Sequence, residues 1–194
     1  PTVVDLDGDM DADFIAASDL RGNVWTFDVR DTSPSTWRSV HTTSGGTPVP
    51  LFTAQDASNN LQPITAKPEV GLHPDDLSGF IVYVGTGKYL ESGDTTNALT
   101  QTFYGLWDDL GNVISGRTAL LQQTVVQELA AFGTQVRVTS NNEIDWATQH
   151  GWFIDLPASG ERQVSDPVLR SGRIIFTTLI PETNVCEFGG SSWL

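Results

Sequence analysis

The sequence predicts an all-β fold, and three observations lead to that prediction. Segments rich in β-branched and aromatic residues recur along the chain, each about four to eight residues long. Turns that contain Gly, Asn, Asp and Pro separate these segments. Charged residues make up only 18% of the 194 residues and hydrophobic residues 39%, a balance that favours a β-rich extracellular protein over a charged helical one.

The sequence pattern of the first half of the chain predicts a hairpin, then a loop-rich stretch, then longer strands. Residues 14–18 and the alternating residues 24–29 form the hairpin, and residues 19–23 supply its turn. A strand over residues 64–70 is expected at a sheet edge, because Pro68 cannot donate a ladder hydrogen bond. The strands predicted after the hairpin lie at residues 37–40, 51–54, 64–70, 80–85 and 102–108.

Residues 118–130 are the most ambiguous segment of the second half. Their Leu and Gln residues suit a helix, but Thr124, Val125 and Val126 favour a strand, and a strand is the prediction adopted. Further strands are predicted at residues 135–139, 151–156, 160–164, 167–169 and 173–179.

A loose internal repeat runs through these segments. Aromatic-rich strands end at Asp28, Asp108 and Asp155, and apolar strands that end in small residues precede two of them. Repeated four-stranded units are the signature of β-propeller blades, and about three to four such blades fit this length. The sequence therefore predicts part of a β-propeller, and a plain β-sandwich is the alternative.

Five aspartates alternate near the N-terminus: Asp5, Asp7, Asp9, Asp11 and Asp13. Carboxylate oxygens suit Ca²⁺, which accepts about six to eight oxygen ligands, better than Mg²⁺, which keeps several waters. Counted from Asp5 in an EF-hand-type loop, the carboxylates fall at positions 1, 3, 5 and 9, and the carbonyl of Asp11 falls at position 7. The alternation predicts a calcium site, and a solvated acidic turn is the alternative.

Two residues depart from that loop pattern. Met10 stands at the sixth position, where Gly makes the sharp turn, and Ala16 stands at the twelfth, where a bidentate acid is usual. Asp13 is therefore expected to be the closing ligand of a compact loop.

The net charge of −14 disfavours nucleic acid and anionic membranes as partners, because no basic stripe is present. No apolar run approaches the roughly twenty residues of a membrane-spanning helix, and any signal peptide is expected to lie upstream of Pro1. Residues 1–194 are expected to form a single segment of a larger secreted protein. Cys186 has no second cysteine in the chain, so it is expected to be a core thiol or to pair outside this segment.

Other motifs carry less weight. Residues 85–88 lack the preceding Gly and the following Ser or Thr of a phosphate-binding loop. His41, His73 and His150 lack metal-ligand spacing and are expected to be surface or loop residues. The six Trp are expected mainly in the core; the alternative is that one or two form an exposed platform for carbohydrate or protein.

Several segments of the sequence, taken together, resemble the PilC/PilY family of type IV pilus biogenesis and tip-adhesin proteins. The resemblance rests on residues 5–29 and then, in order, on residues 84–90, 102–108, 151–157, 160–162, 166–169 and 189–194. It implies a modified β-propeller near the C-terminal end of such proteins, with a calcium loop linked to pilus extension and retraction. By matched position it implies the ligands Asp5, Asp7, Asp9, Asp11 and Asp13, with Met10 where the family commonly has Gly.

The function expected on these grounds is non-enzymatic. A calcium-filled loop would order the following hairpin and present a neighbouring surface to pilins, other pilus-tip proteins, or a host or abiotic surface receptor. The expected location is extracellular, at the pilus tip or the outer membrane. Two alternatives stay open: a quinoprotein-type propeller enzyme, for which the sequence shows no cofactor funnel, and a calcium-dependent carbohydrate-binding module.

Overall fold

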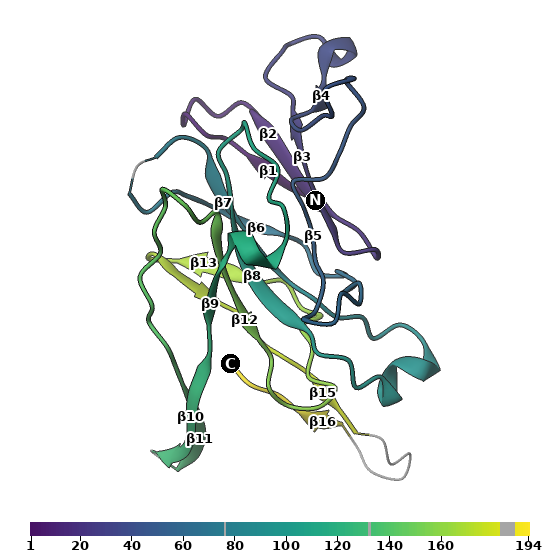
Figure 1. The fold of residues 1–194 in the computed structure, drawn as a ribbon, viewed down its shortest axis with the longest axis vertical. Helices are drawn as coiled ribbons and strands as arrows, with labels where there is room; N and C mark the ends of the chain where they lie inside the picture. The colour runs from purple at the N-terminus through teal and green to yellow at the C-terminus, as the bar shows by residue number, and fades with distance from the viewer. Residues whose placement is uncertain (76, 132, 183–188) are drawn as a thin grey trace.

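The structure, a computed structural model, describes residues 1–75, 77–131, 133–182 and 189–194. In these residues the strands form two five-stranded sheets and three two-stranded sheets, with three short 3-10 helices and no α-helix (Figure 1). None of the helices described is long and apolar enough to cross a membrane. Cys186, expected as a core thiol or as a partner of a cysteine elsewhere, lies outside the described residues.

The first sheet comes from the N-terminal part of the chain. Its first four strands pair antiparallel in sequence order, and its fifth pairs with β3. The strands are β1 (Thr2–Val4), β2 (Phe14–Ser18), β3 (Asn23–Asp28), β4 (Arg38–Ser39) and β5 (Phe52–Thr53). The short 3-10 helix η1 (Pro34–Thr36) precedes β4.

The second sheet contains the longest buried strands. In spatial order its strands are β6 (Glu69–Leu72), β7 (Phe80–Gly85), β8 (Thr102–Asp108), β12 (Gly151–Asp155) and β9 (Leu121–Gln123). All pairs are antiparallel except β12 with β9, which are parallel. The 3-10 helices η2 (Ser92–Thr96) and η3 (Arg117–Ala119) lie in its connections.

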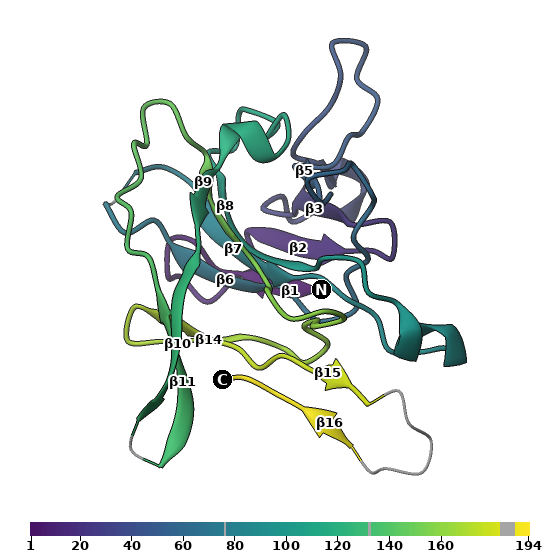
Figure 2. The same ribbon diagram turned by 60° about the horizontal axis from the view of Figure 1, so that its bottom comes forward.

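Three two-stranded ribbons complete the described chain. Figure 2 shows two of them, β10–β11 and β15–β16, extending away from the two large sheets. Their bounds are β10 (Val125–Ala131), β11 (Thr134–Thr139), β13 (Val168–Arg170), β14 (Arg173–Ile175), β15 (Ile180–Pro181) and β16 (Gly190–Ser191).

The two large sheets share one hydrophobic core. Phe14 of β2 packs on Phe80 of β7 with ring centroids 5.5 Å apart, and Phe52 of β5 packs on Tyr104 of β8 at 5.1 Å. All four side chains are almost completely buried. Burying each such side chain contributes about 1.5–3 kcal/mol, so this contact between the sheets is a main source of stability.

Two turns with the same hydrogen-bond pattern connect parts of this core. Asp19 accepts hydrogen bonds from the backbone and the side-chain amide of Asn23, and Asp56 does the same with Asn60. Burial raises the pKa of both carboxyls, but the hydrogen bonds, chiefly those from the Asn side chains, outweigh it, so each pKa lies below its usual value. Residues 19–23, predicted as a turn, are confirmed as one.

Local strand predictions are largely confirmed. The strands predicted at residues 14–18, 80–85 and 102–108 have those bounds, and residues 118–130 contain β9 and most of β10. Three predictions are wrong in detail. The strand expected at residues 173–179 ends at Ile175. The strand expected at residues 64–70 begins only at Glu69, after Pro68, and residues 160–164 contain a single bridge, from Arg162 to Leu179.

The repeat interpretation is wrong for two of its three aromatic strands. β8 and β12 are neighbours in one sheet, where Trp152 lies opposite Gly105, so they do not occupy equivalent places in successive blades. Only two sheets of the described chain have four or more strands, fewer than the three to four blades predicted. Alternation within a strand does not reveal its partner, because pairing joins residues far apart in sequence.

Gly22 provides a test of the packing between the first sheet and the connections around it. It has a φ of 80°, and a Cβ there would lie 2.5 Å from the Gln62 carbonyl oxygen and 2.9 Å from that of Ala54. Gly46 has a φ of 79° with open space around it. We expect Gly46→Ala to cost about 1 kcal/mol of unfolding free energy and Gly22→Ala about 1–3 kcal/mol more. Urea denaturation of both variants checks this, and equal losses would contradict the packing described.

Candidate metal centre

The aspartate loop, residues 5–13, joins β1 to β2. Strand alternation continues into it: Val4 is buried and Leu6 packs against the core, so Asp5 and Asp7 point to the opposite side. On the other arm Phe14 is buried and Asp13 precedes it. Val4 pairs with Phe14, which places Asp5 and Asp13 one residue beyond the last strand pair.

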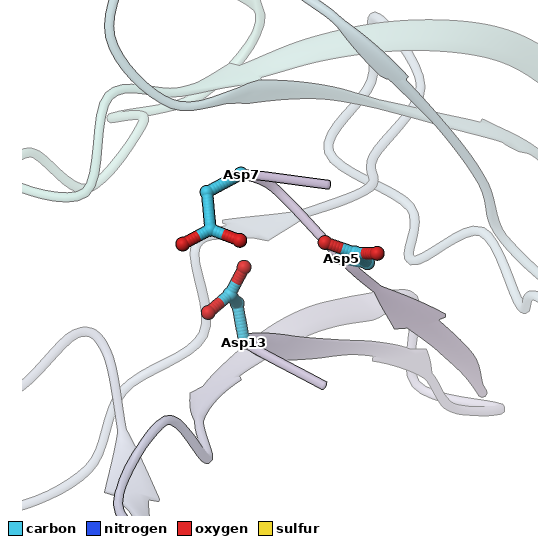
Figure 3. A group of neighbouring side chains, drawn as sticks. All are labelled: Asp5, Asp7 and Asp13. Atoms are coloured by element: carbon cyan, nitrogen blue, oxygen red, sulfur yellow. The ribbon is translucent and has the colours of Figure 1, made fainter. Parts of the chain in front are cut away.

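This register brings three carboxylates together. One oxygen from each of Asp5, Asp7 and Asp13 lies within 4.8 Å of the others. Figure 3 shows the carboxylates of Asp7 and Asp13 pointing toward one another, with Asp5 to one side. Asp5 and Asp7 are exposed and Asp13 is half-buried, so the group opens to solvent.

Backbone amides of the loop hold these carboxylates in place. The N–H of Leu6 donates to Asp13 Oδ2 at 2.7 Å, and the N–H groups of Gly8 and Met10 donate to the two oxygens of Asp5 at 2.7 and 2.9 Å. Such side-chain-to-backbone bonds are typical of Asx turns. They preorganise the carboxylates without using all the lone pairs that a cation would need.

Asp7 and Asp13 each keep one carboxylate oxygen without a hydrogen bond from the described residues. The N–H of Asp9 donates to Asp7 Oδ1 at 3.1 Å. Within the described part of the chain, Asp7 Oδ2 and Asp13 Oδ1 accept no hydrogen bond. These oxygens are therefore available as ligands for a hard cation.

Asp9 and Asp11 stand apart from the group. Asp9 Oδ1 accepts the N–H of Asp11 at 2.8 Å, and both residues are exposed at the tip of the loop. The structure thus gathers the first, third and ninth positions of the predicted loop. Ligation by the Asp9 carboxylate and by the Asp11 carbonyl stays a prediction.

Met10 adopts the conformation that Gly usually supplies at this position. Its φ is 77°, and Gly8 two residues earlier has a φ of 81°. A left-handed conformation costs a residue with a Cβ about 1–2 kcal/mol. The sharp turn is therefore present despite Met10, and the loop stores some backbone strain.

The group carries an excess of negative charge. Two carboxylates about 4 Å apart repel by about 1 kcal/mol in bulk water and more at a protein surface. The nearby Arg30 guanidinium lies 4.9 Å from the Phe14 ring centroid but bonds Asp28, at 3.0 and 2.8 Å. The pKa of Arg30 is raised mainly by its hydrogen bond to Asp28, and the charge of Asp13 adds to this.

All three histidines lie in connections between strands, in agreement with the expectation of surface or loop residues, but two of them are not at the surface. His41 and His73 are buried, and His41 Nε2 lies 3.1 Å from Asp108 Oδ1, a pair 67 residues apart in sequence. His73 packs against Trp107 and Trp146 with centroid distances of 4.9 and 4.3 Å. No spacing signal marks these groups, because strands distant in sequence bring them together.

A family model described as the PilY1 beta-propeller domain matches residues 1–134. This chain belongs to that family. A type IV pilus biogenesis factor PilY1 homolog of Xylella fastidiosa (strain Temecula1) is 35% identical over 99% of this chain and 13% of the relative. PilY1 of Pseudomonas aeruginosa (strain UCBPP-PA14) is 31% identical over 100% of this chain and 20% of the relative. The chain thus spans a fifth or less of these curated relatives.

A solved structure supports the same assignment. The Pseudomonas aeruginosa PilY1 C-terminal domain matches with a TM-score of 0.79 and 29% identity, over 93% of this chain and 44% of that chain. The all-β fold and its place in a β-propeller are therefore confirmed, as is the resemblance to the PilC/PilY family. The relatives are named as biogenesis factors of the type IV pilus, and this chain matches part of them, including a β-propeller domain.

The interaction of Asp28 with Arg30, beside the loop, should make the free energy of unfolding depend on pH. The Arg30 hydrogen bond holds the pKa of Asp28 below 3.8, against the opposing effect of burial. Its contribution is complete above pH 3.8 and is lost as the pH falls through the lower pKa of the folded state. We expect Asp28→Asn to lose about 1 kcal/mol at pH 7 and almost nothing at strongly acidic pH.

Urea unfolding at both pH values measures this difference against the wild-type protein. The exposed Glu143→Gln is the matched control and should change little at either pH. A loss for Asp28→Asn that is the same at both pH values would contradict the assigned ion pair.

Proposed function

We propose that this propeller portion binds Ca²⁺ in the loop of residues 5–13 and serves type IV pilus biogenesis without catalysing a reaction. The observation that carries the proposal is the group formed by Asp5, Asp7 and Asp13, whose oxygens lie within 4.8 Å of one another. Three converging carboxylates at the end of a hairpin form a costly arrangement unless a cation balances their charge. The membership of the PilY1 family supplies the pilus context.

The donor set fits calcium better than other common ions. All three side chains offer hard carboxylate oxygens, and the loop opens to solvent, so carbonyls and waters can complete about six to eight ligands. Asp5, Asp7 and Asp13 would hold the ion, joined by Asp9 and the Asp11 carbonyl if the tip folds inward. The bound cation would supply charge neutralisation, and no redox or acid–base step is proposed.

The conformation of the aspartate loop affects how the first sheet contacts the second. The loop anchors β1, which contacts β6 at the edge of the second sheet, and the hydroxyl of Thr2 donates to the Pro68 carbonyl there. An ordered loop would therefore hold β1 against both sheets. Calcium binding in the loop would therefore stabilise the contact between the two large sheets and the surface that both sheets form.

The partners proposed for this surface are pilins or other pilus-tip proteins, and a host or abiotic surface receptor. The relatives are named as type IV pilus biogenesis factors, which supports a pilus-associated place at the cell surface. Within that setting we propose an extracellular position at the pilus tip or the outer membrane, where calcium occupancy would bias pilus extension against retraction and influence attachment.

Titration calorimetry of chelator-treated protein with Ca²⁺, and separately with Mg²⁺, tests the metal proposal. We expect one calcium-selective site that Asp13→Asn abolishes or weakens by at least tenfold, because Asp13 both faces the ion and holds Leu6. At free Ca²⁺ one hundred times the dissociation constant, the wild-type protein should gain about 2.7 kcal/mol of unfolding free energy.

Two further variants sharpen this test. Asp7→Asn keeps the side-chain shape, removes one charge from the group and should weaken calcium binding. Glu143→Gln removes an exposed charge outside the loop and should leave it unchanged. No heat of binding for the wild-type protein, or equal binding by Asp13→Asn, would leave the loop as an acidic turn.

A further inference from the structure

A second site lies on the outer face of the second sheet, the face turned away from the shared core. Trp152 and Ile154 of β12 project to this face, and Gln123 at the end of β9 lies beside Ile154. Together with residues 139–142, Ile144, Ile174 and Phe176, these side chains line a pocket of about 400 Å³. That volume is within the range of small-molecule sites.

The floor of the pocket is aromatic and is formed by Trp152 and Phe176. Trp152 lies opposite Gly105 on β8, and a Cβ at Gly105 would come within 2.5 Å of the indole Nε1 and 2.8 Å of Cε2. Glycine therefore lets the indole lie flat on the sheet. Phe176 stacks on Phe103 at 3.9 Å with an interplanar angle of 8°, and Phe103 lies 6.0 Å from Trp152.

The rim is polar and is fixed by its own hydrogen bonds. Gln123 Oε1 accepts from the Ser140 hydroxyl at 2.6 Å and from the Asn142 N–H at 3.0 Å, and Gln123 Nε2 donates to the Asn142 carbonyl at 2.7 Å. Asn141 is exposed, and its side chain forms no hydrogen bond with the described residues. Its amide can both donate to and accept from a ligand.

The lining of this pocket carries no ionisable side chain among the described residues. A charged ligand would lose its hydration there without gaining an ion pair, and the net charge of −14 opposes anions in particular. A larger pocket of about 580 Å³ lies beside Arg137. The Arg137 guanidinium already pairs with Glu128 and Glu161 and stacks on Trp193, so that pocket offers no unpaired cation to a ligand.

We propose that the Trp152 pocket is a binding site for a neutral saccharide. A pyranose ring has an apolar face of C–H groups, which removes surface from water when it lies on a flat indole. Its hydroxyl groups need partners when they leave water, and the free amide of Asn141 and the side chain of Asn142 lie at the rim. One flat apolar face combined with several uncharged polar groups is the chemistry that this pocket matches.

The site is independent of the aspartate loop. The loop belongs to the first sheet, and the pocket is built from β9, β12 and the segments that cover the outer face of the second sheet. The proposal therefore does not rest on calcium binding. A saccharide site would add glycans to the receptors that are proposed above for surface attachment.

Saturation-transfer NMR with the purified protein tests the proposal, with cellotetraose and maltotetraose as neutral probes and tetragalacturonate as an acidic one. We expect at least one neutral probe to bind with its ring protons saturated, and the acidic probe not to bind. Trp152→Ala should abolish the signal. Asn141→Ala should weaken binding about fivefold or more, without unfolding risk because that side chain is exposed.

Two controls keep this test decisive. Trp152→Phe retains an aromatic floor and a packed sheet, and should bind more weakly while unfolding like the wild-type protein. Trp37→Phe alters an exposed tryptophan elsewhere, 47% accessible, and should leave binding unchanged. Binding should persist in excess chelator. No binding by either neutral probe, equal binding by a folded Trp152→Ala, or a strict need for Ca²⁺ would each overturn the proposal.

Discussion

The packing of two twisted sheets on one shared core is the constraint on which the rest of this structure depends. Phe14 and Phe80 meet across that core, and Phe52 meets Tyr104 beside them. Because side chains alternate along a strand, a residue whose side chain lies in the core has sequence neighbours whose side chains lie on the other face of the sheet. The aspartate loop follows from that rule. Burial of Val4 and Phe14, with Leu6 packed behind them, leaves Asp5, Asp7 and Asp13 on the opposite side, where they converge.

Two guanidinium groups, one half-buried and one buried, hold the long connections against the sheets. Arg117 bonds Asp155 at 2.7 Å, and its guanidinium lies 4.0 Å from the Phe153 ring centroid. Arg162 is 3% exposed and donates to the carbonyls of Lys88, Asp94 and Asn97. Burial lowers the pKa of Arg162, the expected result for a cation removed from water, and the nearby charge of Asp94 opposes that shift. A guanidinium group that is removed from water is tolerated only when its N–H donors have hydrogen-bond acceptors. The loops that supply these acceptors are therefore held in one position.

Local patterns in the sequence predict much of the fold and part of the metal site. The bounds of β2, β7 and β8 follow from runs of apolar and aromatic residues, and the strand preference of Val125 and Val126 is confirmed by β10. The aspartate alternation identified the loop, but it did not separate Asp5, Asp7 and Asp13 from Asp9 and Asp11. That separation depends on the Val4–Phe14 register, which aligns the two arms of the hairpin and leaves the tip outside.

By itself, the sequence determined the all-β class, the acidic character and the position of the carboxylate loop, because each depends on residues close together in the chain. Only the tertiary structure decided that β12 inserts between β8 and β9, that His41 meets Asp108, and that Trp152 lies flat over Gly105. Each of these contacts joins segments separated by tens of residues. Periodicity says which face a side chain takes, but the partner across that face is chosen by packing and by the closure of loops between distant strands.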